Sequence, residues 1–185
     1  MAETFLLVDG ENIDATLGGS LLGRRPAPEE RPRWDRVLAH AGRVWDQPVR
    51  GLFFLNASAH LPMSFAQALT AIGFRPIPLS GPGDVKVVDV AIDRTLEALA
   101  GREGDVLLAS HDGDFAERIG ALLTAPGRRV GVIGFRELVS GALSQLGADG
   151  LELHDLEDDV GAFTVALPRL RVIPIEAFDP EAFLA

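Results

Sequence analysis

Four aspartates stand where they could bind a divalent cation together. Asp9 directly follows one apolar run, Asp112 and Asp114 lie in the turn after another, and Asp89 lies in the helical pattern between the two runs. Four carboxylates in one cleft cannot all ionise easily without a cation, and hard oxygen ligands suit Mg²⁺ or Mn²⁺. Such a site performs metal-assisted phosphoryl chemistry, in which the metal polarises a phosphate and helps to form hydroxide from water. The alternative for Asp114 is a structural role as the N-cap of the next helix.

Other polar residues could support the acids or meet a phosphate. Asp93 lies one helical turn after Asp89, and Ser110 directly precedes the second acidic turn, so we expect both to help hold the acids in place. We expect Asn12 and Lys86, the single lysine, to contact substrate. Three of these residues also have an ordinary interpretation: Asp93 could pair with a neighbouring arginine, Asn12 could cap its own turn, and Lys86 could be a solvated residue at a helix start.

The elements that must position these residues alternate between short apolar runs and helical patterns, which is typical of an α/β fold with a mostly parallel sheet. The first four apolar runs are continuous, which indicates strands buried on both faces, as in a three-layer α/β/α fold. The expected strands are residues 5–8, 49–55, 74–79, 105–110, 129–135 and 151–154, and the expected helices are residues 34–45, 62–72, 87–100, 115–123 and 137–146. If the first and fourth strands are neighbours, the acids converge at one end of the sheet, where ligands of such folds bind.

Composition excludes several classes of protein. The 185 residues suit one domain, at ~100–200 residues per domain. There is no cysteine, which excludes disulfide scaffolds, thiolate zinc sites and cysteine nucleophiles. No apolar run is long enough to cross a membrane, and the first residues lack the basic cluster of a signal peptide, so we expect a cytoplasmic protein. The net charge of −10 argues against a general nucleic-acid coat but not against a local contact with RNA.

Three segments carry a resemblance to a known family. LVDGENI at residues 7–13, KVVDVA at 86–91 and SHDGDF at 110–115 resemble the three motifs of bacterial NYN-domain proteins, which belong to the PIN-like superfamily of metal-dependent nucleases. The resemblance implies a PIN-like domain over residues 1–155 that cuts RNA with Mg²⁺ or Mn²⁺. It also implies a metal site formed by Asp9, Asp89, Asp112 and Asp114, accompanied by the polar residue Asn12. The sequence departs from the family pattern at His111 and Val87, where small residues are usual.

The segment at residues 18–33 is rich in glycine, proline and charge, and it predicts a loop beside the acids. Arg24 and Arg25 in this segment are the residues that we expect to grip RNA phosphates, together with three further arginines nearby, Arg31, Arg33 and Arg36. Because acidic residues interleave with them, a salt-bridged surface loop is the alternative.

The last part of the chain, residues 156–185, reads as an extension. Its apolar stretch at residues 163–175 is interrupted by Pro168 and Pro174, which is typical of an edge strand. Such a strand could join two copies of the chain in a homodimer, or fold back as a cover.

These observations together predict a metal-dependent endoribonuclease that hydrolyses RNA phosphodiester bonds. The alternative is a non-catalytic RNA- or protein-binding regulatory module on the same fold. A phosphatase of the haloacid-dehalogenase type and a phospho-receiver domain are disfavoured, because Glu11 stands where the former needs aspartate and no aspartate follows the third strand for the latter.

Overall fold

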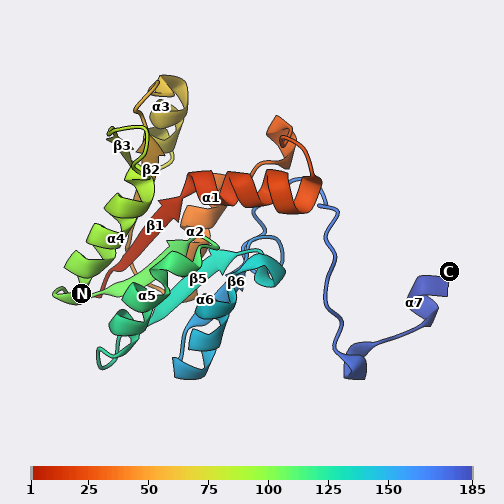
Figure 1. Cartoon of the computed structure of the whole chain (residues 1–185). Helices are drawn as coiled ribbons and strands as arrows, with labels where there is room; N and C mark the ends of the chain where they lie inside the picture. Colours follow the sequence, from red (N-terminus) through yellow and green to blue (C-terminus); the bar gives the residue numbers. More distant parts are fainter. Residues whose placement is uncertain (1, 185) are drawn as a thin grey trace.

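A computed structural model describes residues 2–184 of the chain. It contains one six-stranded sheet in the order β3-β2-β1-β4-β5-β6, and every neighbouring pair of strands is parallel (Figure 1). The strands are β1 (Thr4–Asp9), β2 (Val49–Asn56), β3 (Arg75–Leu79), β4 (Asp105–Ala109), β5 (Val130–Gly134) and β6 (Glu152–Asp155). Each lies within one residue of its expected bounds, and the predicted α/β class is confirmed.

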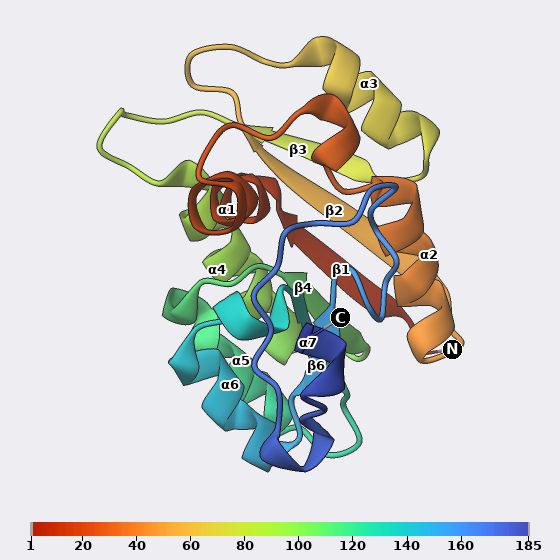
Figure 2. The same cartoon turned by 90° about the vertical axis from the view of Figure 1, so that its right-hand side faces the viewer.

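Helices cover both faces of this sheet. The longer helices are α2 (Trp34–Val44), α3 (Met63–Ala71), α4 (Val87–Ala100) and α5 (Ala116–Leu123), and the shorter ones are α1 (Gly10–Ala15), α6 (Gly141–Gln145) and α7 (Glu181–Leu184). Figure 2 shows α2 on one side of the strands and α4, α5 and α6 on the other. The connection through α4 carries the chain from the edge strand β3 back to the far side of β1. The strand order therefore changes direction between β1 and β4, which is where open parallel sheets bind ligands.

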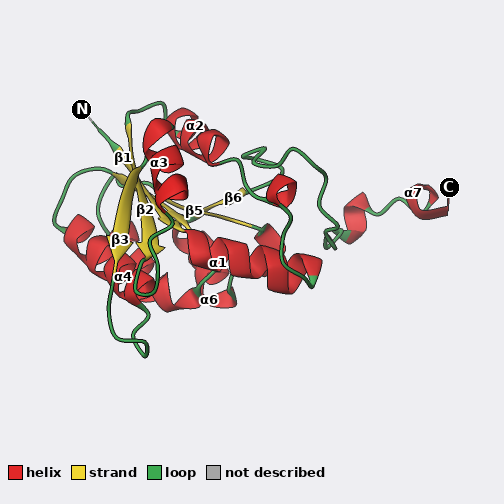
Figure 3. Ribbon diagram, turned by 90° about the horizontal axis from the view of Figure 1, so that it is seen from above, coloured by secondary structure: helices red, strands yellow, loops and turns green. Residues whose placement is uncertain are grey.

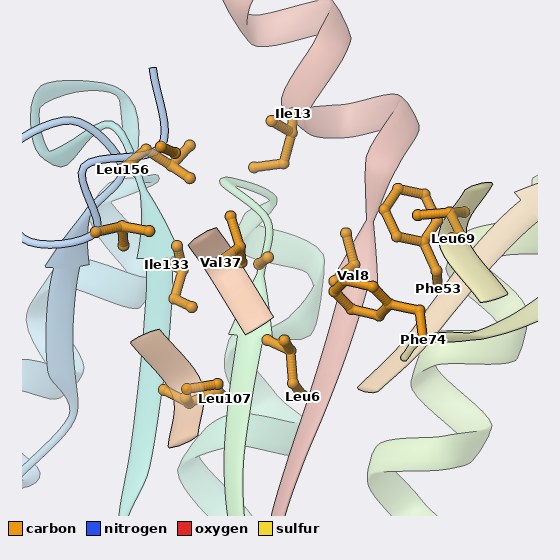
Figure 4. Packing of buried hydrophobic residues seen from close by; sticks show 14 of the residues in the cluster. Leu6, Val8, Ile13, Val37, Phe53, Leu69, Phe74, Leu107, Ile133 and Leu156 are labelled. Atoms are coloured by element: carbon orange, nitrogen blue, oxygen red, sulfur yellow. The ribbon is translucent and has the colours of Figure 1, made fainter. Parts of the chain in front are cut away.

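Two apolar cores result from this arrangement. The first lies between the sheet and α1, α2 and α3, where Val8 and Phe53 from the strands meet Ile13, Val37 and Leu69 (Figure 4). The second lies between the opposite face and the other helices, where residues of alternate strand positions, such as Leu7 and Leu108, meet α4, α5 and α6. Since β1 and β4 contribute to both cores, their continuous apolar sequence is explained by burial on two faces.

The predicted loop at residues 18–33 is wrong in its first part. The helix that begins at Gly10 continues without a break through a π-helical segment, η1 (Thr16–Leu22), and ends at Gly23, whose φ is 65°. Leu17 is buried in the first core, and Leu21 packs against it. These apolar contacts hold the segment helical in spite of its two adjacent glycines. Residues 28–30 form one 3-10 turn, and the rest of the segment is irregular.

The predicted helix at residues 137–146 is shorter than expected. Residues 136–138 form a 3-10 turn, and α6 begins only at Gly141, after Ser140, whose Oγ accepts a hydrogen bond from the Leu143 N–H at 3.3 Å. This side-chain cap fixes the start of the helix.

The predicted strand at residues 163–175 is also wrong, because this stretch forms no strand. Instead, the chain after β6 returns over the first core, where Leu156, Val160, Ala162 and Leu167 are buried. The domain therefore extends beyond residue 155. Residues from 170 onward leave the sheet, with Leu170 95% exposed, and α7 lies apart from the other elements in Figures 1 and 3.

Arg169 anchors this returning segment. Its side chain is only 3% exposed, and its guanidinium donates to both oxygens of Asp155 at 2.6 Å, contacts Glu137 and lies over the ring of Phe135. Asp155 is buried at the end of β6, and its pKa is held well below its usual range by Arg169 and by backbone N–H groups, which outweigh the effect of burial. The pair thus joins the C-terminal segment to the sheet. Within the described part of the chain, no helix is both long enough and apolar enough to span a bilayer.

We expect Arg169→Ala to lower the free energy of unfolding by about 3–5 kcal/mol, because it leaves a buried carboxylate without its cation. The control is Arg171→Ala, which removes a half-exposed arginine paired with Glu157 and Asp158 and is expected to change stability by less than about 1 kcal/mol. Urea unfolding measures both. Equal effects of the two variants would contradict the anchoring role of Arg169.

Candidate acidic site

Asp9 is the most deeply buried acid of the candidate site, with 2% of its surface exposed. It ends the central strand β1 and caps α1. Its Oδ1 accepts a hydrogen bond from the Asn12 N–H at 3.2 Å, and its Oδ2 accepts one from the Ser110 hydroxyl at 3.1 Å. No arginine or lysine of residues 2–184 forms an ion pair with Asp9, so the fold buries this carboxylate with no basic side chain to balance its charge.

Two further carboxylates lie close enough to repel Asp9. Burial, together with the negative charges of Asp89 and Glu11, raises the pKa of Asp9 to about 6, against the lowering effect of its two hydrogen bonds. Burial and Asp89 also raise the pKa of Glu11. Asp89 itself lies 3.5 Å from the ammonium of Lys86, which is largely exposed to solvent. The junction of β1 with α1 and the first turn of α4 thus form a group of three acids.

Asp112 and Asp114 reach the same edge of the sheet through β4. Because Val8 pairs with Ala109, the residues after β1 and β4 lie side by side. Ser110 connects them: its hydroxyl donates to Asp9, and its Oγ accepts from the Asp112 N–H at 3.2 Å. The Asp112 carboxylate caps the following 3-10 turn by accepting from the Asp114 N–H at 2.9 Å, so Asp112, rather than Asp114, is the capping residue. Asp114 is exposed.

These acids meet at one edge without forming a closed cage. Among residues 2–184, no three Asp, Glu or His side chains lie close enough to hold one ion between them. The donor set nevertheless suits Mg²⁺, which proteins usually hold through one or two carboxylates together with water and substrate phosphates. Asp9, buried without a cation, and Asp89 beside it are the residues that would hold such an ion.

Asn12 is oriented by His111, a contact that the sequence did not reveal. The backbone N–H of His111 donates to Asn12 Oδ1 at 2.8 Å, and the ring Nδ1 of His111 lies 3.0 Å from the same oxygen. The Phe135 N–H donates to His111 Nε2 at 2.8 Å, so Nε2 carries no proton and Nδ1 is the donor. Burial lowers the pKa of His111 to about 4, which keeps the ring neutral. The amide NH₂ of Asn12 is therefore the group left for a ligand.

Glu11 is a second member of the site that the sequence analysis passed over. It stands two residues after Asp9 in the first turn of α1, so its position in the motif was a usable signal. Burial and the negative charge of Asp89 raise its pKa.

Asp93 does not join the other acids. Both of its oxygens accept from Arg118 of α5, at 2.8 and 3.0 Å, and this ion pair lowers its pKa. Asp93 therefore does not support the other acids, as we expected, but links α4 to α5. By contrast, Ser110 contacts Asp9 directly, as its expected role requires.

The arginines of the first connection are mostly engaged by neighbouring acids. Arg24 forms a bidentate pair with Glu30. Arg31 lies near Asp14, and Arg33 lies near Asp35.

The other two arginines of this part of the chain form no such pair within residues 2–184. Arg36 donates to the backbone carbonyls of residues 161 and 163. Arg25 forms no ion pair with any described residue and is exposed. The alternative of a salt-bridged surface segment thus applies to Arg24, whereas the positive charge of Arg25 is free to contact a ligand.

The fold has a counterpart among solved structures. A crystal structure of a protein of unknown function from Vibrio parahaemolyticus RIMD 2210633 matches with a TM-score of 0.68 and 22% sequence identity, over 86% of this chain and 95% of that one. This similarity shows the shared fold alone. No protein-family model and no curated protein matches the sequence.

Asp9→Asn should stabilise the metal-free protein at neutral pH. From pH 3.8 to about 6 the unfolded chain loses the Asp9 proton while the folded chain keeps it, so ionisation of Asp9 lowers stability as pH rises through this window. The substitution removes this charge, and we expect the free energy of unfolding to rise by on the order of 2–3 kcal/mol above the window and to match wild type below it.

Denaturant unfolding in a chelating buffer, repeated across the pH range, measures this effect. Asp93→Asn is the matched control, because it removes an acid that is paired with Arg118 and whose pKa is lowered; it should not stabilise at neutral pH. A loss of stability in Asp9→Asn at neutral pH would show that the Asp9 charge is compensated in the fold.

Proposed function

We propose that this protein is a metal-dependent endoribonuclease of the NYN type that hydrolyses RNA phosphodiester bonds with Mg²⁺ or Mn²⁺. The observation that carries the proposal is the burial of Asp9, with no described arginine or lysine paired to it, beside Asp89 and Glu11, where the strand order changes direction. The three segments that resemble the NYN motifs meet at this edge: the first spans the end of β1 and the start of α1, the second begins α4 and the third follows β4. A shared location supports a shared function.

The residues of the site have distinct parts in this proposal. Asp9 and Asp89 would hold the cation, with Glu11 and Asp112 beside them. When bound, the cation supplies Lewis-acid stabilisation to the phosphodiester. Ser110 fixes the orientation of Asp9 through its hydroxyl. His111 fixes the Asn12 amide, whose NH₂ group can donate to a phosphate oxygen.

Few positive charges are left to hold the RNA backbone. Lys86 at the start of α4 and Arg25 after the first helix are exposed, whereas Arg24 is paired with Glu30. With a net charge of −10, the chain would bind RNA weakly and at a local patch. Cellular RNA makes the cytoplasm the expected compartment of this activity.

Cleavage assays with substituted acids test the proposal. We expect Asp9→Asn and Asp89→Asn each to reduce Mn²⁺-dependent cleavage of single-stranded RNA by more than about 100-fold, since each removes an ion-binding carboxylate. Asp93→Asn, on the same helix as Asp89 but paired with Arg118, should retain activity. Gel analysis of labelled RNA with and without a chelator measures the rates.

Purification of all variants by one procedure controls for contaminating nucleases. Equal cleavage by wild type and by both site variants would refute the assignment. RNA binding by a wild-type protein that cuts no RNA with either metal would instead support the non-catalytic RNA-binding module.

A further inference from the structure

A recess adjoins the acids on the side of β2. This cleft, of about 450 Å³, is bordered by Gly10 and Glu11 at the start of α1 and by the carboxyl end of β2. An added Cβ at Gly10 would come within 2.6 Å of the Phe53 ring, so only glycine lets α1 begin this close to β2. Because Gly10 directly follows Asp9, the cleft and the acidic site share one border.

Three aromatic rings from three elements line the cleft. Phe53 of β2 is buried, and the rings of Trp34 from α2 and Phe65 from α3 stand nearly perpendicular to it, with centroids 4.9 and 5.5 Å away. Phe65 is 37% exposed, and Trp34 is partly exposed. An exposed aromatic ring in a cleft offers a face on which a flat ligand can stack.

Polar groups with unused hydrogen-bonding capacity complete the lining. The Nε of Arg31 is buried and donates to no group of the described chain; Asp14 Oδ1 lies 3.4 Å from it without a hydrogen bond. Asn56, the last residue of β2, uses its Oδ1 to accept from the Ser58 N–H at 3.0 Å, which leaves its amide NH₂ as a donor. The cleft therefore combines stacking surfaces with hydrogen-bond donors.

We propose that this cleft binds one unpaired nucleobase of the RNA substrate, next to the phosphate held at the acids. The inference rests on the proposed nuclease function and assigns one base of the substrate to this cleft. Single-stranded RNA is commonly recognised by bases that leave the stack, lie on aromatic rings and accept or donate hydrogen bonds at their edges. The volume is in the range of small-ligand pockets, roughly 300–1,000 Å³, and a base inside a duplex cannot enter it.

A base contact also fits the charge of the chain. Since most arginines near the cleft are paired with acids, phosphate contacts alone give little affinity. Stacking of a base does not depend on net charge, and it contributes enough to shift binding several-fold to more than a hundredfold per base.

Metal-free binding measurements separate this inference from the nuclease proposal. The probe is a fluorescein-labelled single-stranded hexanucleotide RNA, compared with a duplex of the same length in a chelating buffer, with fluorescence anisotropy as the readout. We expect wild type to prefer the single strand, and Phe65→Ala to weaken single-strand binding about tenfold while leaving the weak duplex binding unchanged. Asp9→Asn should bind the single strand at least as well as wild type, whatever happens to its cleavage.

A second variant and a control guard against indirect effects. Asn56→Asp keeps the acceptor for the Ser58 N–H but replaces the donor, so it should also weaken single-strand binding. Phe178→Ala removes an exposed aromatic residue of the C-terminal segment and should bind like wild type. Unchanged binding in folded Phe65→Ala and Asn56→Asp, or equal affinity for single strand and duplex, would overturn the inference. A peptide of residues 170–184 serves as a competitor. If it displaces RNA from the wild-type protein, and if Phe65→Ala no longer binds the peptide but still binds RNA, the cleft belongs to the chain's own C-terminal segment and the inference is overturned.

Discussion

Asp9 is a carboxylate that the fold encloses at the end of a central strand without supplying a positive charge. Two hydrogen bonds, from Asn12 and Ser110, satisfy only part of its capacity, and two other acids lie near enough to disfavour its ionisation. If this position had only a structural role, asparagine or serine would make the fold more stable, because neither places a charge in the interior. The destabilising arrangement is understandable if a cation from solution completes it, and this constraint is the basis of the proposed activity.

The surroundings of Asp9 are connected to the far end of the chain. His111 joins Asn12 to the backbone of Phe135, and its ring stacks on the Phe135 ring. On that ring lies the guanidinium of Arg169, which is held by Asp155. The C-terminal segment is therefore part of the support of the site, and the positioning of Asn12 depends on residues more than a hundred positions away in the sequence.

The sequence predicted what depends on local pattern. Continuous apolar runs indicated strands buried on two faces, and the acids after the first and fourth runs do meet at one edge, because β1 and β4 are neighbours. Contacts between distant residues were beyond such reasoning. Nothing in the helical spacing of Asp93 reveals that Arg118 from the next helix binds it. The apolar stretch at residues 163–175 looked like a strand because its prolines and alternation are compatible with one. Instead, the buried pair of Arg169 with Asp155 holds only its first part against the sheet, and the residues from 170 onward leave it.

Glycine content misled the prediction of the first connection for a related reason. Glycines lower helix propensity, yet residues 16–22 remain helical, because Leu17 and Leu21 gain burial that outweighs the propensity of Gly18 and Gly19. This extension has a consequence for the site. It carries the chain away from Asp9 in an ordered helix, so Arg24 and Arg25 follow its end at Gly23 rather than belonging to a loop that could fold over the acids. Recognition of the substrate next to the acids must then rely on groups fixed around them. These groups carry little positive charge, but they include the aromatic rings of Phe53, Trp34 and Phe65.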